Sequence, residues 1–304
     1  ILASLPQAIQ LMLDPAECGP ATIAMSQDVQ GESFDYPEIF FEEKIHEIRR
    51  AHPDPIQVKQ AADKIKNSKQ PLIISGGGVL YSGAEEELSN FAKKHNIPVT
   101  STVMGIGCMT KDDPYYISAI GALGEGSANN LSKDTDLAIA IGTKLADFTT
   151  ASWSNFENPD FKLVSVNTSR YDVTKHMATG VISDAKIGLQ QISEALGNWR
   201  ANDSWYQRAV KEREKWDTYV KKESGPTNQK EPSYAHAVGA VYRNADDSDI
   251  VVTAAGGLVG EVVQVWKPKQ LNTWESEWGY STMGFEISGS LGIKMAKPDQ
   301  DVVV

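Results

Sequence analysis

The sequence predicts an α/β protein built around a Rossmann-like domain with a parallel sheet. Short segments that are apolar throughout recur along the chain, and glycine turns and stretches with helical spacing of apolar residues separate them. Strands that are apolar on both faces are typical of parallel sheets covered by helices on each side. The 304 residues are enough for about two domains of ~150 residues, so a core of this kind needs no disulfide or metal to stabilise it.

The central Rossmann-like domain is expected over residues 56–200. Continuous apolar composition predicts its strands, and apolar residues that share one face predict its helices. The predicted strands are 71–74, 97–100, 137–141 and 162–167, and the predicted helices are 84–95 and 187–196.

A second α/β unit is expected over residues 233–304. Its alternation of helical and strand signals repeats that of the central domain. The predicted elements are a helix at 233–243, a strand at 250–253, a helix that runs toward Trp266 and a helix of small residues after Gly284. Residues 201–232 are expected to connect the two units through a polar helix at 203–223.

The N-terminal part of the chain is expected to be the end of another domain. Residues 1–36 contain a predicted helix at 5–13 and a short apolar strand at 21–25. The stretch 30–55 mixes glycine, proline and charged residues, which favours a linker at 37–55 with one short helix at 38–50.

The two ends of the chain also carry information. The first residue, Ile1, is not methionine, and the last residues before Val304 form an apolar segment typical of a strand. We therefore interpret the chain as a fragment of a longer protein.

The charge and cysteine content exclude several classes of function. Lysine and arginine total 29 against 40 acidic residues, which gives a net charge of −11, so nucleic acid and anionic membranes are poor partners. No apolar run approaches the ~20 residues of a membrane span. Cys18 and Cys108 lie far apart without metal-ligand spacing, so we predict a cytoplasmic protein without disulfides.

Two glycine turns follow predicted strands. Gly76-Gly77-Gly78 stands where the pyrophosphate of a dinucleotide would meet a helix N-terminus. In the dinucleotide-binding motif G-x-G-x-x-G, however, the third glycine position falls on Tyr81. A purely structural turn is therefore the favoured interpretation, with a bound dinucleotide as the alternative. The turn at 255–258 offers free backbone N–H groups at a helix start, which suits a diphosphate.

Other candidate groups have simple structural interpretations. The histidines stand singly and are expected to be surface or satisfied residues, and Glu85-Glu86-Glu87 is expected to be a solvated helix start. Met283 lies between small residues, and because methionine commonly fills gaps in hydrophobic cores, we expect its side chain to be packed in the core. The sequence has no G-x-S-x-G, Walker A or HExxH motif, so hydrolases, NTPases and zinc peptidases of those kinds lack support.

Taken in order, several segments resemble the three-domain thiamine diphosphate enzymes related to acetohydroxyacid synthase and pyruvate oxidase. The segments that carry the resemblance are 5–9, 19–23, 28–29, 69–78, 98–100, 105–107, 136–143 and 282–285. The resemblance implies a Rossmann-like central domain flanked by partial thiamine diphosphate-binding α/β domains: the end of a pyrimidine-binding domain at 1–36 and the start of a diphosphate-binding domain at 233–304.

Within that family, the closest resemblance is to the hydrolases that open a cyclic 1,2-diketone in inositol breakdown. It is carried by residues 16–24, 26–32, 147–150 and 277–287. The resemblance implies thiamine diphosphate and Mg²⁺ as cofactors and a small cyclic diketone, trihydroxycyclohexane-1,2-dione, as substrate, with a 5-deoxyuronic acid as product. A 2-oxo acid or malonic semialdehyde decarboxylase or synthase is the nearest alternative, and a protein that holds FAD or NAD in its central domain is the other.

The resemblance also implies roles for four residues. Met283 matches the apolar wedge that bends the cofactor, the Ser281 carbonyl and the Met283 N–H would contact its aminopyrimidine, and Gly257 and Leu258 would contact its diphosphate through the backbone. The activating glutamate of the family would precede Ile1, and the Gly-Asp-Gly segment of its Mg²⁺ site would follow Val304. No catalytic or metal residue is therefore expected within the chain, and cofactor binding between subunits implies a homodimer or homotetramer.

Overall fold

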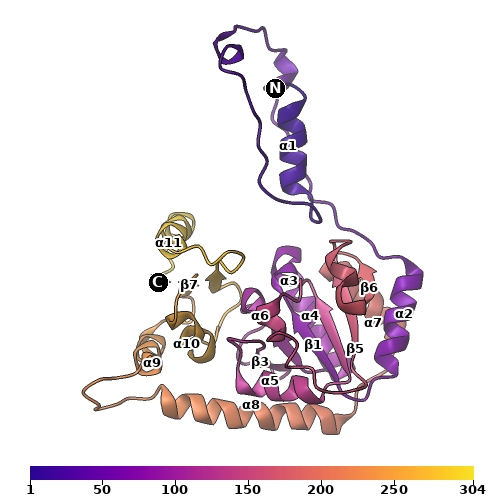
Figure 1. Ribbon diagram of the computed structural model, residues 1–304, viewed down its shortest axis with the longest axis vertical. Helices are drawn as coiled ribbons and strands as arrows, with labels where there is room; N and C mark the ends of the chain where they lie inside the picture. The colour runs from indigo at the N-terminus through magenta and orange to yellow at the C-terminus, as the bar shows by residue number, and fades with distance from the viewer.

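The computed structural model describes residues Ile1–Val304 and contains two parallel sheets with helices around them (Figure 1). The helices are α1 (Ser4–Leu13), α2 (Pro55–Lys66), α3 (Gly77–Ser82), α4 (Glu85–His95), α5 (Gly126–Asp134), α6 (Asp147–Thr150), α7 (Ala185–Leu196), α8 (Asp203–Glu223), α9 (Tyr234–Asn244), α10 (Leu258–Val265) and α11 (Phe285–Ala296). The strands are β1 (Pro71–Ser75), β2 (Val99–Ser101), β3 (Tyr116–Ala119), β4 (Leu137–Ile141), β5 (Lys162–Asn167), β6 (Thr179–Ile182), β7 (Ile250–Thr253), β8 (Trp274–Ser276) and β9 (Val302–Val303). None of the helices combines the length and the apolar character that crossing a bilayer requires.

The larger sheet has the strand order β3-β2-β1-β4-β5-β6, and all its pairings are parallel. This is the doubly wound order, in which the strand sequence reverses direction between β1 and β4. Leu72 pairs with Ala138 and Ile74 with Ala140, so the two strands share one register over their whole length. The predicted α/β class and the parallel sheet are confirmed.

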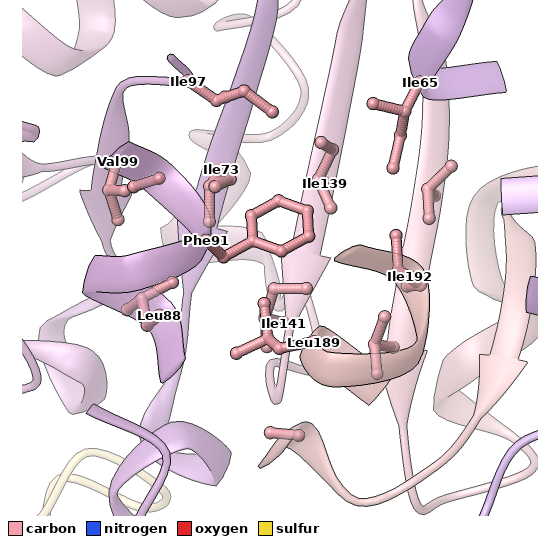
Figure 2. Close-up of a cluster of buried hydrophobic side chains, with 14 of the residues drawn as sticks. Ile65, Ile73, Leu88, Phe91, Ile97, Val99, Ile139, Ile141, Leu189 and Ile192 are labelled. Carbon is pink, nitrogen blue, oxygen red and sulfur yellow. The ribbon is translucent and has the colours of Figure 1, made fainter. Parts of the chain in front are cut away.

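One face of the larger sheet packs against α2, α4 and α7. Alternate residues of β4, Leu137, Ile139 and Ile141, point to this face and are at most 1% exposed. Figure 2 shows the Phe91 ring of α4 beside Ile139 and Ile141, and the same cluster includes the side chains of Ile65 from α2 and Ile192 from α7. This cluster forms the main hydrophobic core, as expected for a sheet covered by amphipathic helices.

The other face of the larger sheet carries small residues. Ala138 and Ala140 of β4 point this way and are fully buried with Leu163 and Ile120. Beyond them α8 packs along α5, and the Trp205 indole N–H donates a 2.8 Å hydrogen bond to the Pro71 carbonyl. The polar helix predicted at 203–223 is therefore confirmed, and its first turns belong to the packing of the central unit.

The smaller sheet has the order β8-β7-β9, again parallel. Its core is shared with the larger sheet, because Val103 and Ala119 of the central unit are buried against Val251, Trp266 and Trp274. A buried ion pair between Glu125 and Lys267 reinforces this contact. The two α/β units consequently pack through one continuous apolar cluster.

The N-terminal residues form an arm that extends away from both sheets (Figure 1). Its helix α1 confirms the helix predicted at 5–13. The strand predicted at 21–25 is wrong, because this segment is largely exposed and has no neighbouring strand to pair with. The helix predicted at 38–50 reduces to a single 3-10 turn at Glu38–Phe40, because no apolar face of this segment packs on the body.

Candidate functional site

The first half of the candidate site is the turn between β7 and α10. The strand β7 is the middle strand of the smaller sheet and is buried throughout. Gly257 is the N-cap of α10, and no side chain caps the helix. A helix N-terminus at the carboxyl end of a parallel strand presents backbone N–H groups and the positive end of the helix dipole, which is the standard position for a bound phosphate.

The backbone of this turn is open to solvent and free to bind. A Cβ added to Gly256 or to Gly257 would meet no atom within 4 Å. Gly256 has a φ of +104°, a conformation that favours glycine. The N–H groups of Gly257 and Leu258 have no hydrogen-bond partner in the chain. The turn therefore combines room above the backbone with unused donors.

The second half of the site is the loop at 277–284, which follows β8. The Glu277 N–H donates to the Thr253 carbonyl at the end of β7 (3.2 Å), so this loop starts beside the first turn. The Glu277 carboxylate then accepts the N–H groups of Tyr280 (2.9 Å) and Thr282 (2.5 Å). These hydrogen bonds hold the pKa of Glu277 below its ordinary value, and the bond from Thr282 has the largest effect.

A second carboxylate ties the two halves together. Glu286, in the first turn of α11, accepts the Ala255 N–H (3.1 Å) with one oxygen and the Gly284 N–H (3.0 Å) with the other. The hydrogen bond from its own N–H and that from Ala255 keep the pKa of Glu286 low. Glu286 thus fixes the distance between the β7–α10 turn and the end of the 277–284 loop.

The hydrogen bonds of the loop leave particular groups unused. While the N–H groups of Tyr280, Thr282 and Gly284 are bound, the Met283 N–H and the Ser281 carbonyl have no partner in the chain. Ser281 has a φ of +51° and Gly284 one of +94°, so the backbone is left-handed at positions on both sides of Met283. The Met283 N–H and the Ser281 carbonyl are two of several backbone groups in this loop without a partner, which also include the Ser281 N–H and the Tyr280 carbonyl.

The Met283 side chain projects from this loop and is 85% exposed. The prediction that Met283 packs in the core is therefore wrong, because no apolar neighbour covers its side chain. Met283 shares this exposure with Ile287 and Leu291 of α11, which are 77% and 63% exposed, so it belongs to a larger apolar surface that is open to a ligand or to another part of the protein.

Comparison with known families supplies the context for this geometry. Residues 58–192 match the family described as "Thiamine pyrophosphate enzyme, central domain", and residues 254–304 match "Thiamine pyrophosphate enzyme, C-terminal TPP binding domain". The chain belongs to the thiamine pyrophosphate enzyme family. The second match begins at the turn before α10 and includes the whole 277–284 loop.

Individual relatives of this thiamine pyrophosphate enzyme carry one name. Proteins named 3D-(3,5/4)-trihydroxycyclohexane-1,2-dione hydrolase from Clostridium tetani, Geobacillus thermodenitrificans and Clostridium perfringens are 36%, 35% and 34% identical to it. Each alignment covers 99% of this chain and 50–51% of the relative. The chain therefore spans about half the length of the curated relatives it matches.

The residues of the site fit thiamine diphosphate. The open glycine turn and the unused N–H groups of Gly257 and Leu258 suit the diphosphate, and the exposed Met283 suits a ring system above it. No group of three or more histidine, cysteine, aspartate or glutamate side chains is arranged to hold a metal ion. The four residues singled out in the sequence lie in two neighbouring loops at one end of the smaller sheet.

Sequence reasoning missed the two carboxylates that shape the site. Glu277 and Glu286 were not recognised, because their partners are backbone N–H groups that carry no sequence signal. For Glu286 a partial signal existed: an acidic residue in the first turn of a helix, just after Gly284, commonly bonds to free N–H groups there. For Glu277 no comparable signal is present.

The other glycine turn, at Gly76-Gly77-Gly78, is closed. The Gly76 N–H donates to the Ile141 carbonyl (2.8 Å) and the Gly78 N–H to the Gly142 carbonyl (2.9 Å). A Cβ on Gly76 would lie 2.4 Å from the Gly142 oxygen. With the Gly76 and Gly78 donors occupied and no room above them, this turn supports the structural interpretation over a bound dinucleotide.

The remaining titratable candidates are structural. His95 is buried and its ring nitrogens contact the Trp199 carbonyl and the Ser193 hydroxyl, so it is a satisfied histidine. Burial raises the pKa of the Cys108 thiol to about 12, which makes the thiol unreactive. Glu87 pairs with Lys186, so the acidic start of α4 is only partly a solvated face.

Proposed function

We propose that this chain is part of a thiamine diphosphate- and Mg²⁺-dependent hydrolase that opens trihydroxycyclohexane-1,2-dione in myo-inositol catabolism. The observation that carries the proposal is the similarity of 99% of the chain to relatives with that printed name. The open cradle at Gly256 and Gly257 supports the cofactor part of the proposal. Residues 1–36 would then be the end of a pyrimidine-binding domain, and residues 233–304 the start of a diphosphate-binding domain. The central domain would occupy residues 56–200, between a linker at 37–55 and a connector at 201–232.

The reaction adds water across the bond between the two adjacent carbonyl carbons. One carbon gains the hydroxyl and becomes a carboxylate, and the other gains a hydrogen and becomes an aldehyde, which gives 5-deoxyglucuronate. When bound, thiamine diphosphate supplies an electron sink for the cleaved bond. The protein's task is to orient the cofactor and the substrate for this cleavage.

The residues of this chain would divide that task between the two loops. Gly257 and Leu258 would hold the diphosphate through their N–H groups at the start of α10. By the family resemblance, the Ser281 carbonyl would accept a hydrogen bond from the aminopyrimidine and the Met283 N–H would donate one to it, and neither group has another partner in the chain. The Met283 side chain would support the cofactor between its two rings. Mg²⁺ would have to be bound mainly by groups outside these residues.

The proposal also covers assembly and location. A site open on one side suits a cofactor shared between two subunits, so we expect a homodimer or homotetramer, in the cytoplasm, with no nucleic acid or membrane partner. Size-exclusion chromatography with light scattering measures the assembly.

The test of function is an activity assay of the protein at the full length of its relatives. The cyclic diketone, pyruvate and malonic semialdehyde are each supplied with thiamine diphosphate and Mg²⁺, and product is identified by mass spectrometry. Ring opening that needs the cofactor supports the proposal. Release of CO₂ from the 2-oxo acid or the semialdehyde, without ring opening, would replace it with the decarboxylase alternative.

A matched pair of variants assigns Met283 in the same assay. Met283→Ala should lower kcat by about 10- to 100-fold while leaving thermal unfolding unchanged, because the side chain is exposed and makes no core contact. Met283→Leu keeps the apolar bulk and should retain most activity. Equal activity of the alanine variant would remove the wedge role from Met283.

A further inference from the structure

Two segments that are distant in the sequence meet where the central unit faces the smaller sheet. Phe148 lies in α6, the short helix after β4, and Trp278 lies at the start of the 277–284 loop. Their ring centroids are 5.5 Å apart with an interplanar angle of 88°, an edge-to-face pair. Figure 1 shows α6 on the side of the central sheet next to the smaller sheet.

The Phe148 side of this contact has a rigid support. Its carbonyl accepts the Ala122 N–H at 2.7 Å. Gly121, with a φ of +114°, comes so close that an added Cβ would lie 2.2 Å from the Phe148 oxygen. The loop after β3 therefore holds the α6 backbone at Phe148, while Phe148 itself stays 54% exposed and reaches Trp278 with its ring.

The Trp278 side belongs to the loop that carries the candidate site. Trp278 is half-buried and packs on the apolar cluster shared by the two units, while Tyr280 and Met283 farther along the loop are 93% and 85% exposed. Trp278 and Phe148 close a small apolar recess together with four central residues, Val103, Ile120, Leu123 and Thr149. The indole is thus the large side chain through which the loop is attached to the central unit.

We propose that Phe148 is a positioning residue for the 277–284 loop. Its ring fixes Trp278, and Trp278 fixes the start of the loop whose free Ser281 carbonyl and Met283 N–H face solvent. The consequence for cofactor orientation rests on the proposed function, but the mechanical link between ring and loop does not. The central unit then contributes to the site without touching a ligand itself.

The test is hydrogen exchange of backbone amides, measured on this chain without any cofactor. Phe148→Leu removes the ring and should speed exchange at Tyr280, Thr282 and Gly284 by about 3- to 10-fold, as expected for losing an aromatic pair. Exchange in β1 and β4 should stay unchanged. Phe148→Tyr keeps the ring and should lie within about twofold of the parent. Tyr171→Leu, an exposed aromatic residue on another loop of the same sheet, is the control and should change nothing in the loop.

A double-mutant cycle with Trp278→Leu tests whether the two rings act on each other. If the proposal holds, the double variant exchanges about as fast as Trp278→Leu alone, because Phe148 acts only through the indole. The proposal would be overturned if Phe148→Leu left exchange in the loop unchanged, or if it raised exchange equally in the loop and in β1. It would also be overturned if the exchange rate of the double variant rose by the product of the two single effects. Should Phe148→Leu fail to fold, Phe148→Met in the same cycle measures the coupling. Because no cofactor is present, these outcomes are independent of whether the chain binds thiamine diphosphate.

Discussion

The two glycine turns of this protein have similar sequences and opposite structural roles. Each follows a buried strand of a parallel sheet and precedes a helix, yet the turn at Gly76-Gly77-Gly78 is packed against Gly142, whereas Gly256-Gly257 faces open space. The difference comes from what lies across the sheet: β4 ends beside β1 and brings its backbone onto the first turn. A glycine-rich turn therefore indicates a ligand site only when its N–H groups remain unused.

The largest expected effect on stability is at Gly76. Its φ of −112° is an ordinary extended conformation, so Gly76→Ala carries no backbone strain, and its cost is purely steric. The new Cβ would lie 2.4 Å from the Gly142 oxygen and 2.6 Å from the Thr143 Cβ. We expect a loss of about 3 kcal/mol in the free energy of unfolding, measured by urea denaturation.

A control for Gly76→Ala is available within α11. A Cβ on Gly292 would meet nothing within 4 Å, so Gly292→Ala should be neutral or stabilise the protein by up to about 1 kcal/mol. A Gly76→Ala variant as stable as Gly292→Ala would mean that the first turn is not closed, and the dinucleotide alternative would return.

The second prediction concerns Gly256, where the strain is in the backbone. Space around Gly256 is open, but its φ of +104° is unfavourable for any residue with a Cβ. Gly256→Ala should therefore cost about 1–2 kcal/mol in unfolding free energy, less than Gly76→Ala and for a different reason. The same urea titration checks it, and a cost equal to that of Gly76→Ala would contradict the contrast between steric and torsional causes.

Continuous apolar segments predicted the central sheet well. The segments 71–74, 137–141 and 162–167 are strands because burial on both faces leaves a local signal. The strands β3 and β6 were missed, since Tyr116–Ala119 and Thr179–Ile182 are short and mix polar with apolar residues. Their pairing depends on partners far along the chain, which no local pattern records. The opposite error at 21–25 has the same cause, because apolar residues there find no partner strand.

The candidate site was predictable in position but not in construction. The turn at 255–258 and Met283 were found from the sequence and from a family resemblance. The bridging role of Glu286 depends on two backbone N–H groups, one of them at Ala255, thirty-one residues away. Contacts of this kind arise from the folded backbone and could not be predicted from side-chain types alone.

The third prediction follows from the lowered pKa of Glu286. A carboxylate with a depressed pKa stabilises the folded loops above its ordinary pKa of 4.5, and this contribution is lost as the pH falls through the lower folded-state pKa. The amide resonances of Ala255 and Gly284 should therefore titrate with a midpoint below 4.5, as measured by NMR. In Glu286→Gln this titration should vanish. A midpoint above 4.5 would show that the two N–H groups do not bind the carboxylate.

The smallest effect on stability is expected at Gly257, and it is the most informative about function. Gly257 has a φ of −68° and open space above it, so Gly257→Ala loses the N-cap preference for glycine but restricts the unfolded chain. Because these two effects oppose each other, the unfolding free energy should change by less than about 0.5 kcal/mol. If the turn holds a diphosphate, however, the new methyl group occupies the ligand's space. Calorimetric titration of the full-length protein with thiamine diphosphate and Mg²⁺ should then show about a tenfold weaker affinity. An unchanged affinity in an equally stable variant would place the diphosphate elsewhere and leave the two glycine turns alike in function.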